Sequence, residues 1–478
     1  MNPEFVRNLW VELTPPRLVL AVLLPGVLIL AAWLRPNPDY SFINNGSLFL
    51  YYVVAVVWGT RRAANAIGSE VRGRTWEGQV MSALSAWSMT WGKLFGGCIL
   101  VWMSALVCLA SSFAVELQIF PTATALENAG LRICNGFAAQ AVAMSSALIF
   151  LRKSASGQSL NSTLSQTVGI LASILFGILF TPTTTQYDWL WTVAVAQLPS
   201  QAVVDWYGID ARAETFRLVS LAVFVGWTWL AANRLMRHVL QYSSLPWAWV
   251  AFVLFVVVYV GGFFASSEGG TSAWLAAAFL VTAFLVYPAA LSDVKDAIAY
   301  GWLARDLAGG RMRSALQRMP AWLPTLVILF VFAVAVALTA PFSTWSALGE
   351  VGDIDQLLAM IASGNWLSTS LMLAILLFVI RDLGIIHMLA FSDASRYSDV
   401  VAFLVLIVLY LVIPVAGSAA GKMALVAAFM PLDLNDPLTT LGPVAVEAVL
   451  TTLGAVVMAR RAARPPKPRA AAPQTAAA

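Results

Sequence analysis

Long apolar runs alternate with short polar segments along nearly the whole chain. Runs of about 17–25 apolar residues have the length of a helix that crosses a hydrocarbon core of ~30 Å. Because lipid offers the backbone no hydrogen-bond partner, such runs are expected to be helices. Twelve of them are found, at about 17–34, 47–66, 92–115, 131–151, 164–181, 215–235, 246–265, 273–291, 321–340, 365–380, 399–418 and 441–458. The pattern predicts an all-α, polytopic integral membrane protein of about twelve transmembrane helices in two six-helix halves.

The first 16 residues have a different pattern, that of a short amphipathic helix. Asn2 is a suitable N-cap and Pro3 suits a first helical turn. Phe5, Leu9 and Leu13 recur every four residues, with polar residues on the other side. We therefore expect an elbow helix that lies in the membrane interface instead of crossing it.

Composition agrees with a membrane location. The chain is 60% hydrophobic and 11% charged, with a mean hydropathy of +0.79, whereas soluble domains carry roughly 25% charged residues. Cys98, Cys108 and Cys134 fall inside predicted spans, match no metal or redox spacing and are interpreted as small buried apolar residues. The sequence predicts contact with membrane lipids. It predicts neither a metal site nor a nucleic-acid partner.

The placement of positive charge predicts the orientation. With the N-terminus inside, 23 of the 28 Lys and Arg residues fall on cytoplasmic segments and five on external ones. Cytoplasmic loops of membrane proteins carry such an excess. We expect a multi-pass protein of the cytoplasmic (inner) membrane with both termini in the cytoplasm.

The two sets of six spans share a pattern of loop lengths. In each, a longer cytoplasmic segment, 67–91 or 292–320, separates the second and third spans. Met81-Ser-Ala-Leu84 is echoed by Met312-Arg-Ser-Ala-Leu316. A duplication would give parallel repeats about an axis along the membrane normal. The predicted divisions are the elbow helix 1–16, a first unit 17–240, a second unit 245–460 and a disordered basic Ala/Pro tail 461–478.

One external segment, 182–214, is long and rich in aromatic residues. Its middle, Leu190–Val204, is apolar but too short to cross the membrane. Interfacial or re-entrant helices are expected there.

The cytoplasmic segment 67–93 is charged, aromatic and compatible with a short helix. Thr75 is a candidate cap for a helix in which Trp76, Val80, Met81 and Leu84 line one side. It then leads into Gly92-Lys-Leu-Phe-Gly96, a small-xxx-small spacing that permits close helix contact. The alternative is a solvated connector whose charged side chains extend to water.

This segment resembles the loop between the second and third spans of type-2 ABC exporter permeases. The positions that match the family pattern are Glu70, Gly73, Thr75, Glu77, Leu84, Ser88, Gly92 and Lys93. Arg74, which splits the usual Gly-Thr pair, and Ala86, where proline is common, depart from it. The resemblance covers residues 1–240, while 245–460 match in span count and loop rhythm.

The resemblance implies that this loop is the coupling helix, which docks onto a separate ABC ATPase subunit. It assigns the contact to Glu70 and Glu77, supported by Arg72 and Arg74, within the segment completed by Gly73, Thr75 and Trp76. No Gly-x-x-x-x-Gly-Lys-Ser/Thr phosphate loop is found in the chain. The chain is then a transport subunit without enzymatic activity or cofactor, and ATP-Mg is expected on the partner. A homo-oligomer is left open.

Polar residues inside spans are further candidates, because a charge at the bilayer centre costs ~3 kcal/mol or more. Glu447 can line a translocation path or pair with a buried donor. Arg381 and Asp382 are expected to pair at the inner end of the tenth span. Asn135 and Gln140 can form helix–helix hydrogen bonds or line a cavity.

Two other functions stay open from the sequence. One is a proton- or ion-coupled secondary transporter of the major facilitator kind, which has the same span count but whose Gly-x-x-x-Asp-Arg-type signature is missing. The other is a membrane-embedded enzyme acting on lipid-linked substrates, which needs clustered acidic, His or Ser groups. The substrate of a transporter cannot be read from these residues.

Overall fold

The structure is a computed structural model that describes residues 2–36, 38–82, 84–154, 162–180, 203–242, 245–266, 270–339, 369–392, 398–422 and 437–463, together with 426, 428 and 429. The chain divides into two compact units, unit 1 (1–248) and unit 2 (249–478). The two units are described separately below.

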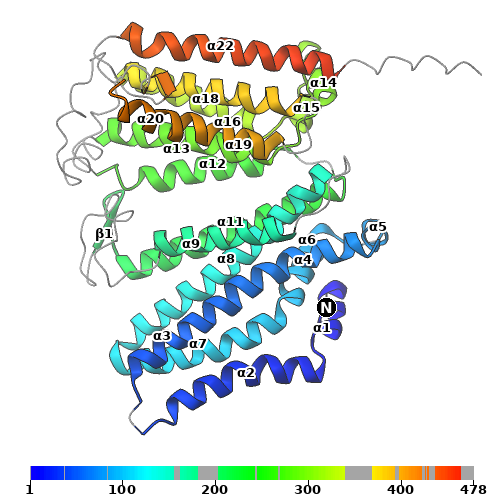
Figure 1. Ribbon diagram of the computed structural model, residues 1–478, viewed down its shortest axis with the longest axis vertical. Coiled ribbons are helices and arrows are strands. Elements are labelled where there is room, and N and C mark those ends of the chain that lie inside the picture. The colour runs from blue at the N-terminus through cyan, green and yellow to red at the C-terminus, as the bar shows by residue number, and fades with distance from the viewer. Residues whose placement is uncertain are drawn as a thin grey trace, which may run out of the picture. The chain divides into compact units, whose positions relative to one another are not determined.

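Unit 1 is a helical bundle with one hairpin (Figure 1). Its elements are α1 (Pro3–Glu12), α2 (Pro15–Trp33), α3 (Tyr40–Tyr52), the π-helix η1 (Val53–Trp58), α4 (Gly59–Arg72), α5 (Trp76–Val80), α6 (Ala86–Trp91), the π-helix η2 (Gly92–Gly96), α7 (Ile99–Ile119), α8 (Thr122–Ser154), α9 (Ser162–Phe180), β1 (Val203–Trp206), β2 (Ile209–Arg212) and α11 (Ala213–Val239).

Unit 2 is also a bundle of helices. Its elements are α12 (Trp247–Gly261), α13 (Gly270–Ser292), α14 (Ala297–Ala308), α15 (Met312–Arg318), α16 (Trp322–Thr339), α18 (Thr369–Ala390), α19 (Ser398–Ile407), the π-helix η5 (Val408–Val412), α20 (Ile413–Ala419) and α22 (Pro437–Ala462).

The predicted fold class, an all-α polytopic membrane protein, is confirmed. In the described residues ten helices are long and apolar enough to cross a membrane. Two shorter apolar helices, Thr163–Gly177 and Trp247–Gly261, stand where the fifth and seventh spans are predicted. α1 is a ten-residue helix that is too short to cross, as expected for an elbow.

Close packing in unit 1 depends on small residues. A side chain at Gly59 would overlap Gln140, and one at Gly169 would overlap Ala143. α4 therefore approaches α8 closely, and α9 packs on both. Helices in lipid gain little from hydrophobic burial against one another, so such contacts and interhelical hydrogen bonds hold them together.

The far end of unit 1, opposite α5, carries a feature that the sequence pattern did not predict. β1 and β2 form an antiparallel hairpin that leads into α11. The interfacial or re-entrant helix predicted at Leu190–Val204 lies outside the described residues as far as 202, and Val203 and Val204 belong to β1 instead. Residues 464–478 of the predicted tail are also outside the described residues.

Unit 2 is organised around α18. This helix packs against α22, α19, α13 and α16, and most of its side chains are buried. Its apolar contacts include Met372, Val379 and Ile386, which meet Phe279 of α13 and Leu329 of α16 in one core.

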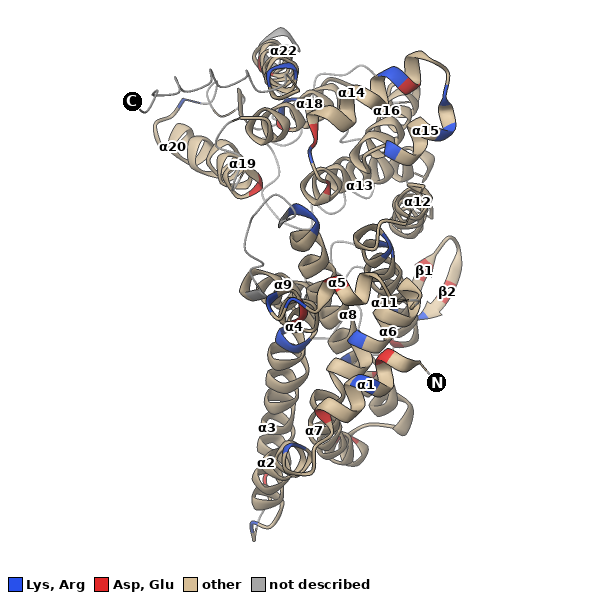
Figure 2. Cartoon of the chain, turned by 90° about the vertical axis from the view of Figure 1, so that its right-hand side faces the viewer, with Lys and Arg blue, Asp and Glu red and all other residues tan. Residues whose placement is uncertain are grey.

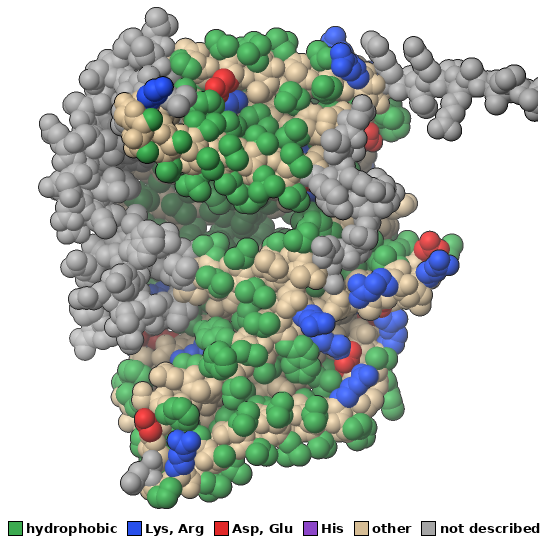
Figure 3. Space-filling view, in the orientation of Figure 1, with side chains coloured by type: hydrophobic (Ala, Val, Ile, Leu, Met, Phe, Trp, Pro, Cys, Tyr) green, Lys and Arg blue, Asp and Glu red, His purple; other side chains and the backbone are tan. Residues whose placement is uncertain are grey.

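Charged side chains of unit 1 gather at the ends of its helices. Figure 2 looks onto the end that carries α1 and α5, and the blue and red segments concentrate there. Figure 3 shows mainly hydrophobic side chains on the flanks of the same helices. Such a distribution is expected of helices whose flanks face hydrocarbon.

Candidate functional site

The candidate site is the end of unit 1 where α1 packs against the start of the third predicted span. Asn2 caps α1 by accepting hydrogen bonds from the backbone N–H groups of Glu4 and Phe5. A Cβ at Gly92 would overlap Glu4, and one at Gly96 would overlap Asn8. The close contact predicted from the Gly92-xxx-Gly96 spacing is therefore confirmed, and its partner is α1.

A buried lysine lies at the centre of this contact. Lys93 is 1% exposed and its Nζ donates to Glu4 at 3.0 Å and to Glu70. Arg7 bonds both carboxylates as well, at 2.9 Å to Glu4 and 2.5 Å to Glu70. We call Glu4, Arg7, Glu70 and Lys93 the elbow network. Its two positive and two negative charges balance, which is the condition under which burying them is tolerable.

The elbow network also fixes α5. Gln79 of α5 donates to Glu70 at 2.6 Å, and the ring of Trp76 lies 5.9 Å from Lys93 Nζ, a cation–π distance. Thr75 does not cap α5 through its side chain as predicted; its hydroxyl instead donates to the carbonyl of Glu70. One carboxylate, Glu70, thus connects the end of α4 to α1, to α5 and to η2.

The turn between α4 and α5 has a strained residue. Arg74 adopts a left-handed backbone conformation with φ of +56°, which is uncommon for a residue with a Cβ. It is the same residue that splits the Gly-Thr pair of the family pattern. The turn places Arg74 on the exposed side of the segment.

The predicted coupling residues divide into two groups. Glu70 is only 12% exposed and serves the elbow network, and Trp76 is half-buried beside it. The others are exposed, namely Arg72, Gly73, Arg74, Thr75 and Glu77. Next to Glu77 the apolar side chain of Met81 is 88% exposed. The outward surface of 72–81 is thus a small mixed patch, which we call the α5 patch.

The sequence echo in unit 2 has a different structure. Met81 follows the last turn of α5, whereas Met312 begins α15. α15 is held to α14 through Asp306, which pairs with Arg311 at 2.9 Å and Arg318 at 3.0 Å. The two segments, 67–91 and 292–320, share short helices but not the residues that anchor them.

The polar residues of the fourth span bridge helices. Gln140 accepts from Trp102 at 3.0 Å and donates to the carbonyl of Ala55, also at 3.0 Å. Asn135 accepts from Ser173 at 2.9 Å. Both side chains are buried, so the structure brings them to helix–helix contacts, the first of the two roles considered.

Unit 2 buries a second charged cluster. Arg381 contacts Asp382 through Nε at 2.9 Å and donates through Nη1 to Glu447 at 3.0 Å. Asp382 also accepts from the hydroxyls of Tyr287 at 2.7 Å and Tyr410 at 2.6 Å. Glu447 thus pairs with a buried donor, one of the two roles that its position in the last span allows.

This cluster corrects the predicted end of the tenth span. The apolar pattern predicts that Arg381 and Asp382 lie at its inner end, but α18 continues to Ala390 and both side chains are fully buried. The helix can continue past two charges because each is paired and hydrogen-bonded. The tyrosines come from α13 and from η5, so no local pattern around 381–382 reveals them.

A polar chain lies at the C-terminal end of α18, about one turn beyond this cluster. Trp322 donates to the hydroxyl of Tyr300, which lies 3.4 Å from Nε2 of His387. Nδ1 of His387 donates to the carbonyl of Leu383 at 2.8 Å, so Nε2 is left to accept from the phenol. Burial raises the pKa of Tyr300 to about 12, so this phenol stays protonated to a higher pH than an ordinary tyrosine.

Comparisons with protein-family models, with curated proteins and with solved structures find no match.

Replacing Lys93 by Met is expected to loosen α1. The substitution leaves Glu4 and Glu70 buried with only Arg7 between them, and removing one partner of a buried pair costs ~3–5 kcal/mol. Hydrogen exchange of the amides of residues 4–12 should accelerate, and the free energy of unfolding in detergent should fall.

The matched control is Arg7→Met, which removes a charge from the same two carboxylates. Arg7 is 47% exposed, and exposed pairs contribute only ~0–1 kcal/mol. Equal losses for the two variants would contradict a network centred on Lys93.

Arg381→Met is expected to destabilise unit 2 more than Glu447→Gln. The first leaves Asp382 buried without its cation, at a cost of ~3–5 kcal/mol. The second removes a carboxylate that is 29% exposed and keeps a hydrogen-bond acceptor for Arg381. Thermal unfolding in detergent measures both; a larger loss for Glu447→Gln would show that Glu447 is the dominant partner.

Proposed function

We propose that the chain is the membrane permease subunit of an ATP-driven ABC exporter, powered by a separate ATPase that binds ATP-Mg. It lies in the cytoplasmic membrane with both termini and the α5 patch on the cytoplasmic side. The observation that carries the proposal is the way α5 is mounted: an exposed helix fixed by buried charges to two membrane-spanning helices.

The mounting suits the transmission of movement. α5 follows α4, the end of the second span, and is tied through Glu70 to Lys93 at the start of the third. A partner that pulls on α5 therefore moves both spans and α1 together. Packed elements of this kind shift as rigid bodies between discrete states instead of deforming continuously.

The α5 patch has the composition of a docking surface. Met81 and Val80 provide exposed apolar contact, and Arg72, Arg74 and Glu77 provide charges of both signs around it. Charged rims determine register and partner choice more than affinity. The resemblance of residues 70–93 to the coupling segment of type-2 ABC exporter permeases supports the same conclusion.

The arrangement changes the roles assigned within the segment. Glu77 is the acidic residue that faces outward, so it is the proposed contact with the ATPase. Glu70 does not make the contact itself; it holds α5 in place by accepting a hydrogen bond from Gln79. Gly73 and Arg74 form the turn that presents the patch.

Ion-coupled transport is the second candidate, and the buried cluster of unit 2 favours it. Ionisable side chains within membrane helices often mark ion pathways or proton relays. Arg381, Asp382 and Glu447 form such a group. The two functions differ in energy source: transport by the first stops without the ATPase, and transport by the second stops when the ion gradient is dissipated.

Substitutions in the α5 patch are expected to release the partner without unfolding the permease. Glu77→Lys and Met81→Asp should each reduce the ATPase activity that co-purifies from native membranes by about tenfold, because each removes ~1–2 kcal/mol or more of interface energy. The measurement is ATP hydrolysis per mole of tagged permease after mild extraction.

Asp210→Lys is the matched control, an exposed charge reversal on β2 at the opposite end of unit 1. It should retain full ATPase recovery. Recovery that is unchanged in the α5 variants, or absent in the unsubstituted protein, contradicts the proposed function.

A further inference from the structure

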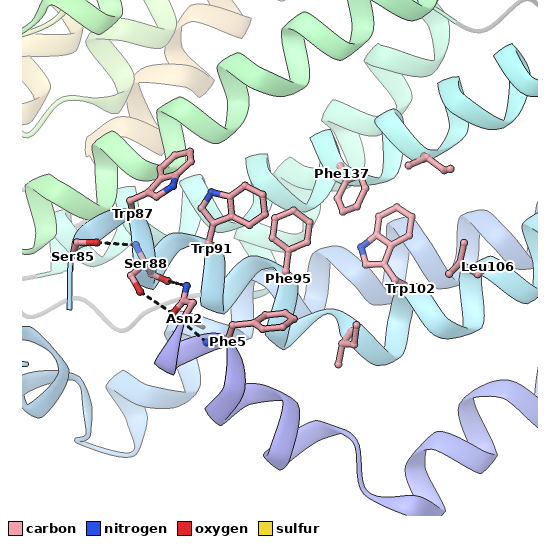
Figure 4. Close-up of a pocket in the computed structure, with 12 residues that line it drawn as sticks. Asn2, Phe5, Ser85, Trp87, Ser88, Trp91, Phe95, Trp102, Leu106 and Phe137 are labelled. Atoms are coloured by element: carbon pink, nitrogen blue, oxygen red, sulfur yellow. Dashed lines mark hydrogen bonds between the residues drawn. The ribbon is translucent and has the colours of Figure 1, made fainter.

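Unit 1 contains an aromatic cavity that the proposed coupling role does not use (Figure 4). Its volume is about 740 Å³, within the range of about 300–1,000 Å³ found for small-molecule sites. One wall is a continuous stripe on the run from α6 through η2 into α7. The residues of this stripe are Trp87, Trp91, Phe95, Ile99, Trp102 and Leu106.

The aromatic walls of the cavity are packed against one another. Trp91 stacks on Phe95 with ring centroids 4.4 Å apart, and Trp102 stacks on Phe137 at 4.1 Å. Trp229 contacts Phe95 edge-on from behind at 5.0 Å, and the Trp102 indole is held by Gln140. Rings fixed in this way keep the space open, and an apolar cavity takes up hydrocarbon more readily than water.

The depth of the cavity matches one leaflet of a bilayer. From Phe95 to Leu106 the stripe rises by about 16 Å at 1.5 Å per residue. Half of a hydrocarbon core of ~30 Å is about 15 Å. Leu106 is 51% exposed, so the deep end opens toward the hydrocarbon beside α7.

The other end of the cavity is polar and uncharged. Asn2 and Ser88 bond each other, with Asn2 Nδ2 donating to the Ser88 carbonyl and Ser88 Oγ donating to Asn2, both at 2.7 Å. Ser85 Oγ accepts from the Ser88 amide at 3.1 Å. A lone pair on Ser88 Oγ and the O–H of Ser85 stay available, which suits a hydroxyl or ester group. Among the residues that the structure describes, no Asp, Glu, Lys or Arg lines the cavity.

We propose that this cavity binds one hydrocarbon chain of a bilayer lipid whose uncharged hydroxyl- or ester-bearing head lies at Asn2, Ser85 and Ser88. The lipid comes from the leaflet in which α1 lies. Its chain follows the aromatic stripe down to Leu106. Because Phe5 of α1 also lines the cavity, the bound lipid contacts the elbow helix directly. The site is independent of the proposed ATPase partner.

Photolabelling of the full chain in lipid nanodiscs tests this site. The probe is a monoacylglycerol with a diazirine near the end of its chain, and labelled peptides are mapped by mass spectrometry. Labelling should concentrate on residues 99–106 and 133–137, about tenfold above helix α2, although α2 is the more exposed helix. Equal labelling of α2 and α7 would show that the probe occupies only the lipid layer around the protein, and it would overturn the proposal.

Two substitutions by tryptophan distinguish labelling inside the cavity from labelling by lipid on the general helix surface. Ile99→Trp fills the cavity and should reduce labelling of 133–137 about tenfold, whereas Leu117→Trp, at an exposed position elsewhere on α7, should leave it unchanged. If Ile99→Trp does not fold, Leu106→Trp at the exposed deep end of the cavity replaces it. A folded filling variant that labels normally contradicts the site.

The head group is tested by competition. Unlabelled monoacylglycerol should displace the probe at lower concentration than a fatty acid of the same chain length, because a carboxylate has no cation to pair with in the lining. Ser85→Val should remove this preference, while the labelling of residues 99–106 by the probe should persist. Equal competition by both compounds in the unsubstituted protein would contradict the assignment of the polar end.

Discussion

The organisation of unit 1 at its charged end depends on burying one lysine between two carboxylates. Lys93 lies at the start of the third span, Glu4 on the elbow helix and Glu70 at the end of the second span. An unpaired ammonium or carboxylate in this position would cost several kcal/mol. The three elements can therefore separate only by exposing or neutralising charges, and Gly92 and Gly96 allow the approach that closes the network.

The two proposals for unit 1 both depend on this arrangement. On its outer side the network supports α5 and the α5 patch through Gln79 and Trp76. On its inner side the same docking of α1 places Asn2 and Phe5 at the mouth of the aromatic cavity. A lipid in the cavity and a protein on the patch would thus contact the two sides of one rigid assembly.

The sequence predicted what depends on local pattern. Apolar runs located the spans, and Asn2 with Pro3 located the start of α1, because hydropathy and capping act over a few residues. Long-range pairing is not contained in the local pattern. The resemblance assigns Glu70 to the partner contact, because nothing near it in the sequence shows that Lys93, 23 residues later, pairs with it. Arg381 and Asp382 were likewise placed at a helix end, because Tyr287 and Tyr410 are remote in sequence. The aromatic stripe from Trp87 to Leu106, spaced by three or four residues, is a signal that helical periodicity does contain.

The most direct test of the account is the distance between α1 and α5, measured by pulsed electron spin resonance. Spin labels at the exposed positions Trp10 and Met81 would be introduced after replacing Cys98, Cys108 and Cys134 by Ala. If the buried lysine holds these elements together, the distance distribution is narrow and broadens when Lys93 is also replaced by Met. A distribution that is broad from the start, or unchanged by loss of Lys93, would contradict the claim that the buried lysine holds these elements together.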